Sequence, residues 1–380
     1  MNFNMPVPED MDMVILVLAR KLADVEREKG QEDAETLELA ERMGVLLRLN
    51  GDYSGAGRHF EMVLAARTRK LGPEHPETVA AAHGLGSALH LSGDFAGARD
   101  VLARVLDSCE RLLGPDHPQT ALSASYLAAA YTGLGDHASA RLLLERAFES
   151  ASRVSGPTHP DTLQAAIGLG GALLGLNEPK EAREILSRTY SACLNLYGPL
   201  HQGTAAAGKL LGTALLDCGE YSLAAKRLAE VLGPLKAAYG RFNPMVADVL
   251  TDLSTALSHT GDHQGALDSL RAALPASVKS YGADHPTTHR IAGKAGVIMG
   301  ATGVDPQKAR RLIEMAAEGL ERLLGKGEPD AVAFRLFLDA LRKTYGPDRP
   351  DGDKGGGAAG RSGAGDKSSA YADLLGIHDA

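Results

Sequence analysis

The sequence predicts an all-α protein in which one helix–turn–helix unit is repeated along the chain as a solenoid. Three observations predict it: a six-residue tag returns every 42 residues, apolar residues recur at spacings of three, four and seven, and a glycine–acid pair divides each unit. A fixed period of this length is typical of stacked units that contact only their neighbours. The 380 residues therefore need not form two or three globular domains.

The tag joins one unit to the next. Its best copies read Leu71-Gly-Pro-Glu-His-Pro76, Leu113-Gly-Pro-Asp-His-Pro118 and Ser155-Gly-Pro-Thr-His-Pro160. We expect the glycine to end one helix, and the second proline to lie in the first turn of the next, where its missing amide hydrogen costs nothing. The tag histidines belong to different units and are too far apart to share a metal ion, so we expect them to bond to nearby backbone.

The first helix of each unit is predicted at about 77–91 in the second unit. It opens with a threonine, replaced once by Val246, and a large apolar residue follows after seven positions. A small residue comes next, and a second large one three positions later. These spacings lie on one helical face, and the small residue should let the second helix approach closely. In the second unit the four columns hold Thr78, Leu85, Gly86 and Leu89.

A turn and a second helix complete the unit. Glycine followed by an acid, as in Gly93-Asp94, should end the first helix and favour the start of the second; Asn177-Glu178 replaces the pair once. The second helix, at about 95–112, carries an alanine column and, four residues later, a column of large apolar residues. The latter column holds Phe60, Leu102, Leu144, Leu186, Leu228, Leu270 and Leu312.

Seven units are predicted within residues 31–325, and the last gains one residue at Gly325. We expect residues 1–30 to form an N-terminal capping helix, with Val14 and Leu18 in the alanine and large apolar columns. Residues 326–345 should form a C-terminal capping helix that opens at Pro329. Solenoid ends need such caps. The seven units are 31–72, 73–114, 115–156, 157–198, 199–240, 241–282 and 283–325.

The chain after the last predicted helix changes in composition. Residues 346–368 are rich in glycine and are predicted to be a disordered linker. Residues 369–380 form a short apolar segment in which Tyr371, Leu374 and Leu375 share a helical face. This segment could fold back onto the units and occupy their binding face.

The unit resembles the tetratricopeptide repeat, since Leu85-Gly86, Leu89, Ala98 and Leu102 follow that family's order of small and large residues. The 42-residue period and the tag are similar to the kinesin-light-chain variety. The resemblance implies a right-handed α-α superhelix whose first helices line a concave groove. Kinesin light chains carry a pair of asparagines that reach cargo peptides. This chain has none at those positions, so those cargo contacts are not expected.

Composition and motifs point away from catalysis. The net charge of −8 gives no basic footprint for nucleic acid, and the apolar run from Met13 to Ala19 is too short to span a bilayer. Cys109, Cys193 and Cys218 are too few and scattered for a disulfide framework or zinc site. No catalytic constellation stands out. We therefore expect a cytoplasmic, non-enzymatic protein without cofactor, metal, nucleic-acid partner or membrane insertion.

The predicted function is that of a scaffold or adaptor that holds a partner's peptide or helix in the groove. Two alternatives stay open: a regulatory subunit inhibited by its own C-terminal tail, and a self-assembling structural protein that dimerises through the N-terminal helix. The resemblance places the candidate partner-binding residues on the first helices, away from the packing columns. They are His83, Ser87, His90, Tyr126, Thr132, Ile167, Leu174, Lys209, Leu210, Thr213, Leu216 and Asp252.

Overall fold

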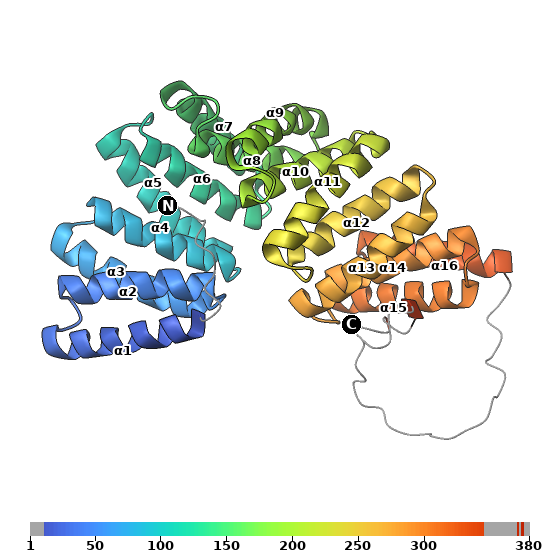
Figure 1. Ribbon diagram of the computed structural model, residues 1–380, viewed down its shortest axis with the longest axis horizontal. Helices are drawn as coiled ribbons and strands as arrows, with labels where there is room; N and C mark the ends of the chain where they lie inside the picture. Colours follow the sequence, from blue (N-terminus) through green and yellow to red (C-terminus); the bar gives the residue numbers. More distant parts are fainter. Residues whose placement is uncertain (1–10, 346–370, 372–373, 376–380) are drawn as a thin grey trace, which may run out of the picture. The chain divides into compact units, whose positions relative to one another are not determined.

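The computed structural model describes residues 11–345 together with Tyr371, Leu374 and Leu375. These residues form α-helices and no strand, which confirms the predicted all-α class (Figure 1). The linker predicted at 346–368 lies outside the described residues. The chain divides into two compact units, unit 1 (Met1–Ala192) and unit 2 (Cys193–Ala380), and each is described by itself.

Unit 1 begins with α1 and continues as helix pairs in which each helix packs on the next, from α1 to α8. Helix α9 begins in unit 1 and ends in unit 2. The bounds are α1 (Met11–Lys29), α2 (Ala34–Leu49), α3 (Tyr53–Leu71), α4 (Pro76–Leu91), α5 (Phe95–Leu113), α6 (Pro118–Gly133), α7 (His137–Val154), α8 (Pro160–Gly175) and α9 (Pro179–Tyr197).

Unit 2 continues the alternation, and consecutive helices from α10 to α16 pack on one another. The bounds are α10 (Gln202–Asp217), α11 (Tyr221–Tyr239), α12 (Pro244–His259), α13 (His263–Tyr281), α14 (Pro286–Thr302), α15 (Pro306–Leu324) and α16 (Pro329–Tyr345). The even-numbered helices from α2 to α14 are thus the predicted first helices, and the odd-numbered ones from α3 to α15 the second.

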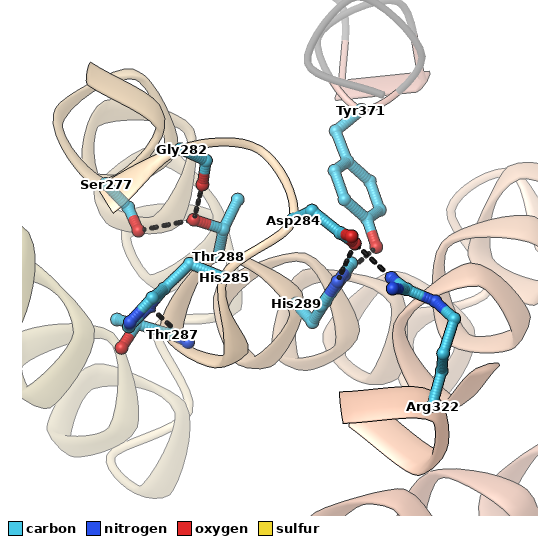
Figure 2. Close-up of polar contacts among 9 residues, drawn as sticks. All are labelled: Ser277, Gly282, Asp284, His285, Thr287, Thr288, His289, Arg322 and Tyr371. Carbon is cyan, nitrogen blue, oxygen red and sulfur yellow. Dashed lines mark hydrogen bonds and ion pairs between the residues drawn. The ribbon is translucent and has the colours of Figure 1, made fainter. Parts of the chain in front are cut away.

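The tag is a helix–loop–helix joint. Its glycine ends the second helix with φ near +90° and ψ near 160°, as at Gly114 (87°, 164°). The tag histidine caps the next helix, since Nδ1 of His117 accepts from the amide of Gln119 at 3.1 Å. The column threonine bonds back to the glycine carbonyl, as Thr120 Oγ1 does to Gly114 at 2.8 Å. Figure 2 shows the two hydrogen bonds of the joint before α14, from the Thr287 amide to His285 and from Thr288 Oγ1 to the Gly282 carbonyl.

Replacing Gly114 with alanine is expected to destabilise unit 1 by about 1–3 kcal/mol, because residues with a Cβ rarely adopt these dihedral angles. A Cβ at Gly114 would meet nothing within 4 Å, so the loss would come from the backbone alone. Gly57 is the matched control: it also has open space, but its φ is helical, and Gly57→Ala should stabilise by about 0.5–1 kcal/mol. Urea denaturation followed by circular dichroism measures both changes.

The small column of the first helix lets the two helices of a pair approach closely. A Cβ built on Gly86 would lie 2.6 Å from Leu102, and one on Gly212 would lie 2.4 Å from Leu228. The leucine side chain therefore occupies the space that the glycine leaves. The turn glycines have positive φ, and Asn177 takes φ 60° in their place, as its sequence position predicts.

Two sequence predictions for the last unit are wrong. The extra residue is not at Gly325 but in the turn before Asp305, which is the N-cap of α15 as Asp262 is of α13. The large apolar column therefore continues at Ile313 rather than Leu312, and Ile313 Cγ1 lies 2.7 Å from a Cβ built on Gly296. The 42-residue count misplaces the column because the added residue precedes it.

Helix α1 covers the start of unit 1. Leu18, Leu22 and Val25 are buried in a cluster with residues of α2 and α3. Leu18 is therefore buried, as its column predicts, but Val14 is 40% exposed. Met13 and Val17 are also exposed, at 59% and 60%, so one apolar face of α1 is in contact with solvent.

Candidate binding faces

The candidate residues of unit 1 all come from the first helices α4, α6 and α8. Of these, α6 packs against both α4 and α8 (Figure 1). We call the side-chain surface given by Ser87, His90, Tyr126, Ile167 and Leu174 the first-helix face. All five side chains are partly buried, and none is fully exposed. These five side chains therefore pack partly against the protein and are partly accessible to a ligand.

His83 is the one candidate that the structure buries. Its Nε2 lies 2.9 Å from Ser123 Oγ, and its Nδ1 lies 3.2 Å from Gln119 Nε2. Since Ser123 donates its own proton to the Gln119 carbonyl, its oxygen accepts from His83 Nε2, and Nδ1 accepts from the amide. His83 thus ties α4 to α6 as a neutral imidazole, and its pKa is lowered to about 4 by burial.

His83 should make unit 1 sensitive to acid. Its pKa is about 4 in the folded chain and near 6.5 in the unfolded one, so the unfolded state binds more protons between these values. The stability that the neutral His83 imidazole contributes is fully present above pH 6.5, and it is lost as the pH falls from 6.5 towards 4. Between pH 7 and pH 5 the wild type should lose about 2 kcal/mol more than His83→Gln. Urea denaturation at both pH values measures the difference; equal losses would contradict the neutral-imidazole assignment.

The first-helix face of unit 1 is mainly apolar. The Tyr126 ring lies against His83, with 5.3 Å between ring centroids, and burial raises the pKa of the Tyr126 hydroxyl. The His90 ring meets Phe95 edge-on at the same distance. Together with Ile167 and Leu174, these side chains offer rings and aliphatic groups rather than charges. Such a surface suits an apolar segment of a ligand.

Three of the five candidates of unit 2, namely Lys209, Thr213 and Asp252, instead make polar contacts between α10 and α12. Lys209 Nζ, on α10, lies 2.9 Å from an oxygen of Asp248, on α12. Thr213 donates to Asp252 at 2.8 Å. Burial raises the pKa of Asp252, and the Thr213 hydrogen bond and Lys209 oppose that rise. Thr213, Lys209 and Asp252 therefore link neighbouring first helices, while Leu210 and Leu216 are the apolar candidates of this unit, both half-buried.

Sequence reasoning missed a pocket of about 460 Å³ in unit 1. Leu163, Leu169 and Leu173 of α8 line it, with Phe148 of α7 and Ile185 of α9. Leu169 and Leu173 occupy the two large apolar columns of the first helix, and Leu163 directly follows the column threonine, so their sequence gives no sign of a local opening. Charged side chains from α7 and α9 complete the lining: Glu145, Glu181, Glu184 and Arg188.

Metal binding and thiol reactivity are two kinds of chemistry that the described residues do not favour. Within 11–345 and the three later residues, no group of three His, Cys, Asp or Glu side chains could hold a metal ion. Burial raises the pKa of the Cys109 thiol and raises that of Cys193 to about 11, which disfavours the nucleophilic thiolate. None of the described helices is both long and apolar enough to cross a membrane.

Comparison with known proteins identifies the repeat. Two family models, both described as tetratricopeptide repeat, match residues 34–110, 87–153, 143–195 and 246–287. No curated protein matches the chain. The quorum sensor NprR from B. thuringiensis, in its apo form, is similar in structure at 13% identity, with 88% of this chain and 99% of that chain covered and a TM-score of 0.52.

Two further solved structures are similar. A Rap protein complexed with competence and sporulation factor shares 12% identity, covers 87% of this chain and 98% of its own, and gives a TM-score of 0.51. Tetratricopeptide-like repeats of a putative kinesin light chain from Podospora anserina share 24% identity over 53% of this chain and 95% of that chain, with a TM-score of 0.46. At these identities the similarity concerns the fold alone.

Proposed function

Because the chain belongs to the tetratricopeptide repeat family, we propose that it is a non-enzymatic scaffold or adaptor that binds a partner's peptide or helix on its first helices. One observation carries the proposal: Tyr126, Ile167 and Leu174 are apolar residues on neighbouring first helices, and each keeps part of its side chain exposed to solvent. Tyr126 also packs against a core cluster of unit 1, and a ligand with an apolar centre would bury the part of these side chains that solvent still reaches.

A selected peptide tests the proposal directly. A phage library of 16-residue peptides is selected on the full chain, and the best binder is labelled and titrated by fluorescence anisotropy. Leu174→Glu should weaken binding at least tenfold, because a bound apolar segment would desolvate the new carboxylate. The matched control is Leu142→Glu on α7, where the side chain is 64% exposed; it should leave the affinity unchanged.

Two outcomes would refute this proposal: failure to select any peptide, or equal affinity of the selected peptide for wild type and Leu174→Glu. Leu216→Glu repeats the test in unit 2, where charged Lys209, Asp248 and Asp252 lie on the same first helices as the apolar candidates or on the next one. A peptide that binds there should carry charged residues beside its apolar centre. A cytoplasmic location and the lack of a nucleic-acid partner belong to the same proposal.

Self-assembly through α1 is the second candidate. Met13, Leu16 and Val17 are 59%, 48% and 60% exposed on one described helix, and a second copy could cover them. Light scattering decides it: a monomeric mass removes this candidate, and a dimer that dissociates on Val17→Lys supports it.

A further inference from the structure

Tyr371, in the chain's C-terminal segment, contacts the last repeat of unit 2. The Tyr371 side chain has no exposed surface, and Leu375 is 3% exposed. The Tyr371 hydroxyl lies 2.6 Å from His289 Nδ1 near the start of α14, and the two rings meet edge-on with 5.8 Å between centroids. Figure 2 shows Tyr371 directed toward His289, Asp284 and Arg322, which come from α14, the loop before it, and α15.

The hydrogen bonds of this site show which groups donate and which accept. His289 Nε2 lies 3.0 Å from Asp284 Oδ1. An ionised carboxylate can only accept, so Nε2 carries the proton and Nδ1 is left to accept from the Tyr371 hydroxyl. Arg322 pairs with the same Asp284 oxygen and holds it in place. Burial, and then the charge of Asp284, raise the pKa of Tyr371, which keeps the phenol protonated as a donor.

The ion pair of this site also occurs in other repeats, whereas the imidazole occurs in the last repeat alone. The Arg322–Asp284 pair has counterparts at the same positions in Arg69–Glu32, Arg111–Glu74 and Arg153–Asp116. The imidazole has none, since the positions equivalent to His289 are apolar: Leu37, Val79, Ala121, Leu163, Ala205 and Ala247.

A second substitution makes room for the imidazole. A Cβ built on Gly319 of α15 would lie 2.4 Å from His289 Cε1. The equivalent positions in the other second helices all hold larger residues: Ala66, Ser108, Ser150, Ala192, Pro234 and Ala276. The His289 imidazole and the space that Gly319 leaves for it therefore occur together, in the one repeat that Tyr371 contacts.

We propose that α14, α15 and the loop before α14 form a docking site for one helical turn that presents a tyrosine and, four residues later, a leucine. Tyr371 and Leu375 of the same chain occupy it in cis. Two deeply buried side chains and one hydrogen bond make an interface far smaller than the roughly 800 Å² per partner of a stable complex. The segment therefore docks reversibly, and a partner that carries the same turn displaces it.

The tether should dominate this competition. Twenty-five residues (346–370) separate the end of α16 from Tyr371. A tether of this kind typically gives an effective concentration in the millimolar range. A free copy of the segment at micromolar concentration should therefore bind only when the attached copy is disabled.

The experiment uses the full chain and a fluorescein-labelled synthetic peptide of residues 369–380. The open variant, Tyr371→Ala with Leu375→Ala, should bind the peptide at least tenfold more tightly than wild type does. Adding His289→Leu should weaken binding at least tenfold, and this change restores a residue found at the equivalent positions 37 and 163. Replacing the peptide's tyrosine with phenylalanine should cost about fivefold, the effect of one hydrogen bond.

The matched control is His285→Asn in the open variant. His285 caps α14 through the amide of Thr287, and Asn243 already performs this role in the preceding unit, so binding should not change. Circular dichroism verifies that each variant is folded. Equal binding to wild type and the open variant, no binding to the open variant, or undiminished binding after His289→Leu would each overturn the proposal. So would a wild-type dimer that the peptide dissociates, since the segment would then come from a second copy.

Discussion

Replacing Gly170 with leucine is expected to lower the free energy of unfolding of unit 1 by roughly 3 kcal/mol. A Cβ at Gly170 would lie 2.5 Å from Leu186 Cδ2 and Cγ, and Leu186 is fully buried. The added atoms must therefore displace the buried Leu186 side chain or move α8 away from α9. Urea denaturation followed by circular dichroism measures the loss.

The control for this change is Gly57→Leu on α3, where a Cβ would meet nothing within 4 Å. Both substitutions replace a helical glycine with the same residue, so both gain the same helix propensity. The control should therefore be neutral or stabilising. If both variants lost stability equally, close helix approach would not be the reason for the small column.

Leu228→Ala is expected to destabilise unit 2 by about 2–5 kcal/mol, the cost of truncating a buried leucine in a core that cannot fully collapse. Leu228 has no exposed surface, and it fills the space over Gly212. Repeat proteins can unfold in parts, so amide hydrogen exchange read by mass spectrometry is the suitable measurement. Protection should fall most in α10, α11 and α12.

Leu223→Ala tests the same helix at a site that is 45% exposed. The residue type and the change are identical, and only the burial differs. We expect a loss within about 0.5 kcal/mol. A loss comparable to that of Leu228→Ala would mean that α11 contributes through helix propensity rather than through its buried column.

The sequence was sufficient for the repeat and for its joints. Glycine with positive φ, histidine as a helix cap and threonine near the helix start each fill a fixed position, so their roles can be read from the period. Counting failed only where Val304 adds a residue to a turn and shifts every later position by one. The turn itself still begins with glycine, which hid the shift.

The contacts between neighbouring repeats were harder to predict from the sequence. A column shows which face a residue occupies, but not the neighbour that it meets. His83 occupies an inner position by its column, yet it is buried because Ser123 and Gln119 on α6 complete its hydrogen bonds. Whether the remaining candidate residues bind a partner stays a prediction.

Two residues of the sequence mark the docking site of Tyr371. His289 and Gly319 both depart from their columns, and each makes sense only beside the other. The repeat pattern relates only residues at equivalent positions in the repeats, however, and Tyr371 lies beyond the last repeat. The expectation that the C-terminal segment could fold back concerned the binding face of the first helices. The described contact is instead with His289 and the residues around it.

Hydrogen exchange of the full chain with and without a saturating selected peptide tests the central claim most directly. If the first helices bind, the peptide should slow exchange in α6 and α8, where Tyr126, Ile167 and Leu174 lie, and leave α5 and α7 unchanged. Protection confined to α5, α7 or the tag loops would contradict the account, because it would place the ligand on the second helices or the joints.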